Sequence, residues 1–288
     1  GGTSVRWAGI TPRFQAHEFR SLSTYGAMDD TTLLDWPLTL EELAPYSASS
    51  QFPQGLANSS GHLGRNYMRH MTFATFAIMP GEVNFHRGTR QSGLLFDEQY
   101  HKPERGFAGG YLIETAGTDP YLTAASLGTW GKSLADYMDN YNRLGATWVT
   151  GEDPPQSSNR ITFDDSEKDQ YGLPVPEIEY EFHPNSMAMF EHGKKQCEGL
   201  LTSLGGRRPV STLGVGGGCH NMGVARMSDK PADGVTNPWG QAHDVDNLFV
   251  TDGSLFTTSA AANPTLTIVA LAIRQADHIA ERMVRNEL

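Results

Sequence analysis

Between residues 68 and 183 the sequence alternates between short segments rich in β-branched and aromatic residues and breaks rich in proline and glycine. Such segments suit a pleated, half-buried surface, and short breaks between them favour neighbouring antiparallel strands. We expect strands at residues 72–79, 107–114, 147–150, 160–163 and 177–182, and a further buried strand at 247–251. The pattern predicts a mainly antiparallel sheet.

Helical spacing of apolar residues predicts helices on either side of these strands. One is expected over residues 127–143, a second from Pro184 to the stop at Gly205-Gly206, and a last one that begins at Asn263. Asn263 suits the N-cap and Pro264 the first helical position. A short helix capped by Thr39 is expected near the N-terminus. The spacing places two sets of residues on one face each: Met187, Phe190, Lys194, Cys197, Leu201 and Leu204 on the second helix, and Leu266, Val269, Ala270, Ile273, Ala276, Ala280 and Met283 on the last.

Composition excludes several classes of protein. The chain has 288 residues and a net charge of −11, without a cluster of Lys and Arg, which argues against nucleic-acid binding. Its longest apolar run, residues 266–273, is too short to cross a bilayer, and no signal peptide is recognised. Two cysteines cannot form a disulfide framework, so they fit a reducing compartment or a fold that needs no bridge.

Three features near the C-terminus form a candidate site. His220 follows a run of glycines that leaves room for a flat ligand, and an imidazole has a pKa suited to a general base near neutral pH. Asp252 ends the expected strand, and the helix that begins at Asn263 offers unpaired amides to an anion or an electron-rich group. Each feature also has a purely structural interpretation, as a hydrogen-bonded histidine, a turn and a helix cap.

Other catalytic patterns are missing from the sequence. It contains no G-x-S-x-G nucleophile elbow, no H-E-x-x-H zinc motif and no phosphate-binding G-x-x-x-x-G-K loop. Cys219 and His220 lack partner ligands at zinc spacing, so no metal site is expected.

Four segments nevertheless resemble segments of one protein family, and they occur in the same order along the chain as in that family. The longest reads CHNMGVARM, then DGVTN, then AHDVDNLFVTDGSLFTTSAAANPTLTIVALA, and the others are GGTSVRWAGITPRF, LANSSGHLGRNYMRH and GLPVPEIEYEFHPN. They resemble the glucose–methanol–choline (GMC) oxidoreductases, flavoenzymes that oxidise alcohols and sugars. The resemblance is nearest to the gluconate, fructose and sorbose dehydrogenase branch.

The resemblance implies FAD as cofactor and assigns roles to individual residues. His220 matches the histidine that takes the hydroxyl proton while hydride passes to flavin N5, and Asn263 matches the residue that hydrogen-bonds the substrate oxygen. The implied flavin contacts lie at three places: Gly2, Thr3, Ser4 and Trp7; Asp252, Gly253 and Ser254; and Pro264 and Thr265.

The chain departs from the family pattern in two ways. The βαβ unit with G-x-G-x-x-G that holds the ADP half of FAD is not found, and a middle block of the flavin domain is missing between Tyr46 and Ser47. We therefore expect an α+β chain, with a substrate domain of antiparallel sheet and flanking helices at residues 67–204. A reduced remnant of an FAD-binding α/β domain is expected from residues 1–66 and 205–288, with some exposed apolar surface.

Two functions follow as hypotheses. The first is an FAD-dependent oxidoreductase that oxidises a CH–OH group of a sugar, polyol or sugar acid. The alternative is a non-catalytic or truncated binding or scaffold module without FAD. The family implies a small-molecule alcohol or sugar substrate, an electron-acceptor subunit or cytochrome, and a periplasmic or membrane-associated location, with a cytoplasmic one still open. No nucleic-acid partner and no transmembrane segment are expected.

Overall fold

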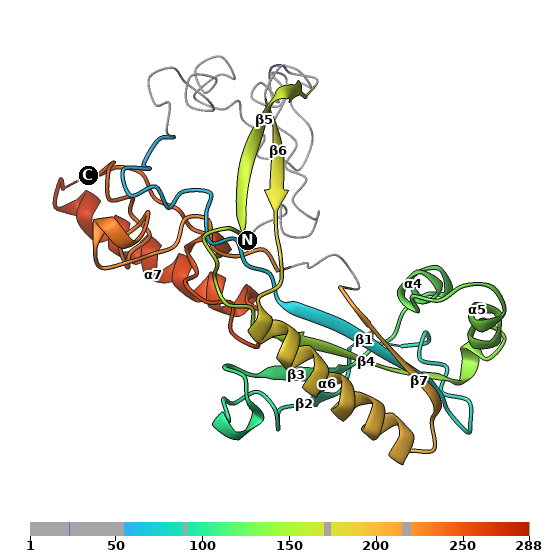
Figure 1. The fold of residues 1–288 in the computed structure, drawn as a ribbon. Coiled ribbons are helices and arrows are strands. Elements are labelled where there is room, and N and C mark those ends of the chain that lie inside the picture. Colours follow the sequence, from blue (N-terminus) through green and yellow to red (C-terminus); the bar gives the residue numbers. More distant parts are fainter. Residues whose placement is uncertain (1–22, 24–54, 89–90, 170–173, 215–219, 288) are drawn as a thin grey trace.

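The computed structural model describes residue 23 and residues 55–88, 91–169, 174–214 and 220–287 (Figure 1). The helix expected near Thr39 and the four implied flavin contacts Gly2, Thr3, Ser4 and Trp7 lie outside these described residues. Within them, no helix is both long and apolar enough to cross a membrane.

A five-stranded sheet forms the centre of the described chain. Its strand order is β2-β3-β4-β1-β7, and every neighbouring pair is antiparallel. The predicted antiparallel sheet and the α+β class are confirmed. The strands are β1 (Met71–Ile78), β2 (Leu94–Leu95), β3 (Tyr111–Thr115), β4 (Leu144–Gly151) and β7 (Arg207–Leu213). Strand β7 lies beyond residue 204, where we expected the substrate domain to end, and it pairs with β1.

Helix α6 (Pro184–Ser203) packs against one face of this sheet. Its buried side chains, which include Met189 and Phe190, join Phe73 of β1 and Val149 of β4 in one apolar core. Gly193 allows the close approach, because a Cβ atom there would lie 3.0 Å from the ring of Phe73. The helix was predicted at this position.

The prediction of which residues share the packed face of α6 was only partly right. Phe190, Cys197 and Leu201 are buried, but Met187 and Leu204 are exposed. The buried face instead includes Met189 and Gly193, and Gly193 lies against the ring of Phe73.

The single helix expected over residues 127–143 is wrong. The structure has α4 (Pro120–Ser126), α5 (Gly131–Met138) and the 3-10 turn η3 (Tyr141–Arg143) instead. Gly128 and Gly131 both have φ of 60°, a left-handed conformation that interrupts a right-handed helix. The resulting bend lets Leu127 and Tyr137 cover the second face of the sheet over Phe76.

Strands β5 (Arg160–Lys168) and β6 (Pro174–Glu179) form a separate antiparallel pair. Figure 1 shows this pair extending away from the five-stranded sheet. The strand predicted at residues 160–163 is confirmed and is longer than expected. The strand predicted at 177–182 begins and ends three residues earlier.

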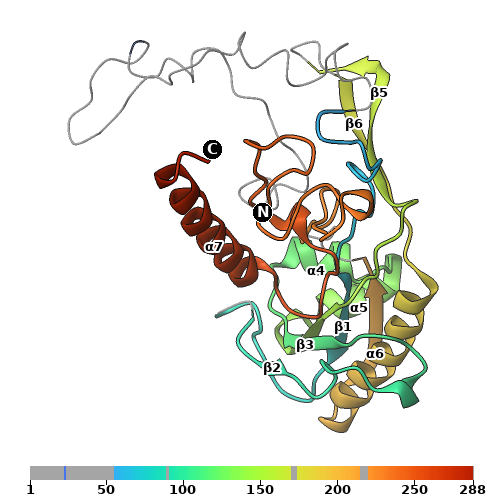
Figure 2. The same ribbon diagram turned by 90° about the vertical axis from the view of Figure 1, so that its left-hand side faces the viewer.

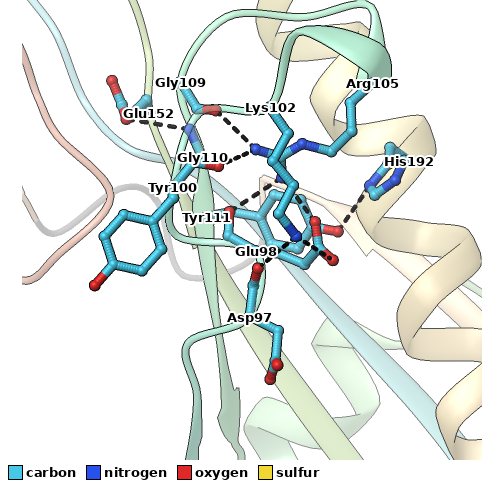
Figure 3. A network of polar contacts seen from close by, with 10 residues as sticks. All are labelled: Asp97, Glu98, Tyr100, Lys102, Arg105, Gly109, Gly110, Tyr111, Glu152 and His192. Carbon is cyan, nitrogen blue, oxygen red and sulfur yellow. Dashed lines mark hydrogen bonds and ion pairs between the residues drawn. The ribbon is translucent and has the colours of Figure 1, made fainter.

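A network of polar contacts holds the loop between β2 and β3 (Figure 3). Nη1 of Arg105, in the 3-10 turn η2 (Pro103–Arg105), lies 2.7 Å from Oε2 of Glu98 and also donates to the Glu98 carbonyl. Gly110 is required where this loop enters β3, because a Cβ atom there would lie 2.0 Å from the carbonyl oxygen of Gln99. The hydroxyl of Tyr111 lies 2.8 Å from Nδ1 of His192, which ties the strand to α6.

Helix α7 (Thr265–Val284) lies at the margin of the described chain, beside the loops of residues 220–264 (Figure 2). It begins one residue later than predicted, with Pro264 rather than Asn263 at the N-cap position. Its apolar stripe is not buried as the spacing suggested, since Leu266 is 81% exposed and Ile273 is 60% exposed. Polar and aromatic contacts hold it instead: Gln275 donates to the carbonyls of Trp239 and Val250, and His278 stacks on Trp239.

Candidate active site around His220

His220 is positioned by backbone pairing just beyond it. Met222 and Met68 exchange two backbone hydrogen bonds of 2.9 Å, so the segment after His220 lies antiparallel to the segment before β1. Gly223 on the same segment donates to the carbonyl of Gly253. This pairing places His220 beside His70, the residue that precedes β1.

The two imidazoles form a hydrogen-bonded pair. Nδ1 of His220 lies 2.8 Å from Nδ1 of His70, and the rings meet edge to face with their centroids 4.9 Å apart. Nε2 of His70 lies 3.0 Å from the carbonyl oxygen of Ser259. His70 is almost completely buried, whereas His220 is partly exposed. The pair therefore joins a protected imidazole to an accessible one.

Burial sets the protonation of both rings. It lowers the pKa of His70 to about 4, with the neighbouring His220 as the next cause. Burial also lowers the pKa of His220. Both rings are thus neutral near pH 7, and a neutral imidazole can accept a proton. Among the described residues, Nε2 of His220 makes no hydrogen bond, so it is the nitrogen available to a substrate.

Asp153 holds the carbonyl that His70 contacts. Its backbone N–H donates to Oγ of Ser259 at 2.7 Å, and that hydroxyl donates back to the Asp153 carbonyl at 3.1 Å. The buried carboxylate of Asp153 accepts hydrogen bonds from the hydroxyls of Tyr180 and Ser186, each at 2.8 Å. Burial raises the pKa of Asp153 despite these bonds. The network connects the end of β4 and the start of α6 to the loop before α7.

Within the described residues, the first amides of α7 have no hydrogen-bond acceptor. The first intrahelical bond runs from the N–H of Ile268 to the carbonyl of Pro264, so the N–H groups of Thr265, Leu266 and Thr267 have no acceptor within the helix. Pro264 is buried, and Asn263 and Thr265 are exposed. Together with the helix dipole, these amides favour an anion or an electron-rich edge.

We had expected Asp252 to end a strand, but it does not. Residues 247–251 form no strand, and their one strand-like contact is an isolated bridge between Phe249 and Gln241. Oδ1 of Asp252 accepts hydrogen bonds from the N–H of Ser254 at 2.8 Å and from its hydroxyl at 2.5 Å, and so caps the turn η6 (Gly253–Leu255). In place of a strand, the N–H of Val250 donates to the carbonyl of Gly240, and the carbonyl of Leu248 accepts from the N–H of Ala242.

The buried Gly253 connects this turn to the rest of the site. A Cβ atom there would lie 3.0 Å from the carbonyl oxygen of Asn221 and 3.4 Å from Ile268 of α7. The structure therefore brings the segment of His220, the turn at Asp252 and the first turn of α7 together.

His70 and Asp153 are the residues that sequence reasoning missed. His70 ends the segment LANSSGHLGRNYMRH, whose resemblance to the family gave no role to this histidine. The single available signal was a histidine next to a strong strand pattern, which more often indicates an ordinary core residue. Asp153 lies in a loop rich in proline and resembles a turn residue. Among the described residues, no cluster of three His, Cys, Asp or Glu side chains could hold a metal ion.

Comparisons with known proteins agree with one another. A protein-family model described as GMC oxidoreductase matches residues 155–272. The chain is 36% identical to a 2-methyl-1,2-propanediol dehydrogenase of Mycolicibacterium austroafricanum, over 82% of this chain and 45% of the relative. It is 28% identical to the fructose dehydrogenase large subunit of Gluconobacter japonicus, over 81% of this chain and 44% of the relative.

The fold is also shared with solved structures. A formate oxidase of Aspergillus oryzae RIB40 matches with a TM-score of 0.58 at 12% identity, over 84% of this chain and 50% of that one. The chain thus spans about half the length of the proteins it resembles.

Proposed function

The chain belongs to the GMC oxidoreductase family, and we propose from this that it oxidises a CH–OH group of a sugar, polyol or sugar acid. The electrons would pass as hydride to FAD, with His220 as the base. The observation that carries the proposal is the accessible Nε2 of His220, on a ring held through Nδ1 beside the segment that leads to α7.

The described residues fit the redox end of a flavin. The unpaired amides of Thr265, Leu266 and Thr267 suit its electron-rich pyrimidine edge, and a neutral imidazole suits the substrate side. When bound, FAD supplies an acceptor for the hydride. Pro264, Thr265, Asp252, Gly253 and Ser254 are proposed as its contacts, together with Gly2, Thr3, Ser4 and Trp7 outside the described residues.

Gly223, the described glycine nearest to His220, does not supply a cradle for the phosphates. A Cβ atom on Gly223 would lie 2.0 Å from the carbonyl oxygen of Asn66, so this glycine is needed for packing against protein. We therefore assign no contact with the ADP half of FAD to Gly223. We retain as a proposal the division into a partial FAD-binding domain at residues 1–66 and 205–288 and a substrate domain at 67–204.

The chain's own residues have distinct tasks in the proposed reaction. Nε2 of His220 accepts the proton of the substrate hydroxyl, while the C–H bond breaks and its electron pair leaves as hydride, which yields a carbonyl. The exposed amide of Asn263 donates a hydrogen bond to the substrate oxygen. The positive end of α7 stabilises negative charge that develops nearby.

The partners are proposed by analogy with the relatives. One of these is named as the large subunit of a fructose dehydrogenase and another as a gluconate 2-dehydrogenase flavoprotein. We propose a small alcohol or sugar as substrate and a separate electron-acceptor subunit.

The test is a cofactor and activity assay on one preparation. The purified chain is incubated with FAD and passed through a desalting column, and the retained visible flavin absorbance is recorded. Dye reduction is then measured with fructose, gluconate and 2-methyl-1,2-propanediol. We expect retained flavin and dye reduction that His220→Ala abolishes and the control His192→Ala preserves. Absence of both flavin and dye reduction would overturn the proposal in favour of a non-catalytic module.

A further inference from the structure

We propose that His70 is a positioning residue that fixes the tautomer of His220 and leaves its Nε2 without a proton. The inference concerns the structure of the pair, and it rests on the proposed function only where it gives Nε2 the role of base. The observations that carry it are the two hydrogen bonds of the His70 ring and the nature of the group at each end.

The assignment starts at the carbonyl of Ser259. A carbonyl oxygen only accepts hydrogen bonds, so Nε2 of His70, 3.0 Å away, must carry a proton and donate it. In a neutral imidazole the other nitrogen is then bare. Nδ1 of His70 is therefore an acceptor.

His70 remains neutral because its surroundings disfavour a charge. The ring is 1% exposed, and the other groups that act on it are His220 and the backbone at Ser259 and Ala260. Burial and, next, the nearby His220 oppose its protonation, and each of the two backbone contacts that favour it is a smaller influence, so the pKa of His70 falls to about 4. Among the described residues that act on the ring, none carries a negative charge to offset the cost.

The proton on His220 follows by elimination. Its Nδ1 lies 2.8 Å from the bare Nδ1 of His70, and a hydrogen bond at this distance needs one donor. His220 must supply that proton from Nδ1, which leaves its Nε2 bare. The buried acceptor thus selects one of the two neutral forms that an imidazole adopts in water.

This choice has a direct chemical consequence. A base whose Nε2 already carries a proton cannot accept another without first rearranging, so the wrong tautomer is inactive. When Nε2 of His220 takes a proton, the positive ring still donates through Nδ1 to His70, which stabilises the charge. In functional histidines generally, the hydrogen bond made by one ring nitrogen decides which nitrogen carries the proton and how the ring is oriented.

The surrounding structure holds the partner in place. His70 follows the Met68–Met222 pairing and precedes β1, which is buried along its whole length. The Ser259 carbonyl is held through the two hydrogen bonds between Ser259 and Asp153. One end of the chain of bonds is therefore held by a buried strand and the other by two further hydrogen bonds.

Nitrogen NMR of the histidine rings tests the assignment without cofactor or activity. The chain is labelled with ¹⁵N-histidine, and long-range proton–nitrogen spectra at neutral pH report which nitrogen of each ring is protonated. Loss of one ring in His220→Gln identifies the signals of His220. We expect His220 protonated at Nδ1 and bare at Nε2, and His70 with the opposite pattern. A His220 ring protonated at Nε2 in the unmodified chain would overturn the proposal.

Variants of His70 provide the second measurement. His70→Leu removes the acceptor and should give a mixture of His220 tautomers, whereas His70→Gln offers both a donor and an acceptor and should restore the Nδ1–H form. His192→Leu is the control, since it removes a different ring, partly buried, that also hydrogen-bonds through Nδ1. An unchanged His220 tautomer in a folded His70→Leu chain would contradict the inference. If that variant does not fold, the spectrum of the unmodified chain decides.

Activity separates this inference from the proposed function. In the dye-reduction assay, His70→Leu should lower kcat by about 10–100-fold with little change in KM, as expected for loss of a partner that orients a functional histidine. His70→Gln should recover part of this loss. If the ring spectra fit but the unmodified chain retains no flavin and reduces no dye, the tautomer assignment stands and the proposed function fails. A rise in KM alone, with kcat unchanged, would contradict the positioning role.

Discussion

Replacing Gly223 with alanine should both destabilise the protein and separate the two histidines. Gly223 has φ of 80°, a conformation that costs an L-residue about 1–2 kcal/mol. A Cβ atom there would lie 2.0 Å from the carbonyl oxygen of Asn66 and 3.3 Å from Met68. Contacts of Cβ atoms below 3.0 Å essentially do not occur, so the two backbone segments must move apart.

The size of the effect follows from the bonds that hold those segments. Met222 and Met68 exchange two backbone hydrogen bonds next to the clash. Their loss removes about 0.5–1.5 kcal/mol each, so with the strain of the left-handed conformation Gly223→Ala should cost about 2–5 kcal/mol. A domain typically has about 5–15 kcal/mol of net stability, so the variant should remain measurable.

Gly214 offers a matched control. Its φ is 76°, almost the same, but no heavy atom of the described residues lies within 4 Å of a Cβ placed there. Gly214→Ala should therefore cost the conformational strain alone, about 1–2 kcal/mol. The difference between the two variants isolates the clash with Asn66.

Urea unfolding followed by circular dichroism measures both variants, and the histidine spectra report on the site. Gly223→Ala should unfold at a lower urea concentration than Gly214→Ala and should lose the Nδ1–Nδ1 bond between His70 and His220. Equal midpoints for the two variants, with the His220 tautomer intact in both, would refute the reasoning.

Three further predictions concern buried groups. Burial raises the pKa of Glu114, so the folded state binds this proton more tightly than the unfolded chain does. Stability should therefore fall as the pH rises from the pKa of Glu114 in the unfolded chain through its raised pKa in the folded state. Glu114→Gln should flatten this dependence in thermal melts across acid pH. Asp153→Ala leaves the hydroxyls of Tyr180 and Ser186 without their acceptor and should cost about 2–5 kcal/mol in urea unfolding, and Asp153→Asn much less; equal losses would contradict the role of these bonds. Burial raises the pKa of Cys197 to about 11, so its thiol should resist iodoacetamide in the native protein and react after unfolding, as mass spectrometry of the labelled peptide would show.

Local patterns in the sequence predicted the parts of the fold that depend on local chemistry. The strand at residues 72–79 and the helix that begins at Pro184 were found within a residue of their positions, because a β-branched run and a proline start leave few alternatives. The helix predicted over residues 127–143 failed at Gly128 and Gly131. Helical spacing of apolar residues continued across them, and the spacing alone does not reveal two left-handed glycines.

Contacts between distant segments were beyond such patterns. His220 was singled out from its glycine-rich surroundings and from the family resemblance, but its partner His70 lies 150 residues earlier in the chain. Nothing local to His70 distinguishes it from a core histidine, since its burial and its bond to Ser259 arise only when three separate segments meet. The proposed base could therefore be named from the sequence, whereas the partner that contacts its ring could not.

Helix α7 shows the same limit in its packing. Its spacing predicted one buried apolar stripe, yet Leu266, Val269 and Ile273 are exposed and Gln275 is the buried residue. Periodicity locates the apolar face of a helix but says nothing of what covers it. The helix is instead held by the hydrogen bonds of Gln275 and by the stacked ring of Trp239, which fix its axis while leaving the stripe free. Those contacts lie more than two turns from Thr265, so they hold the helix without engaging the amides at its start.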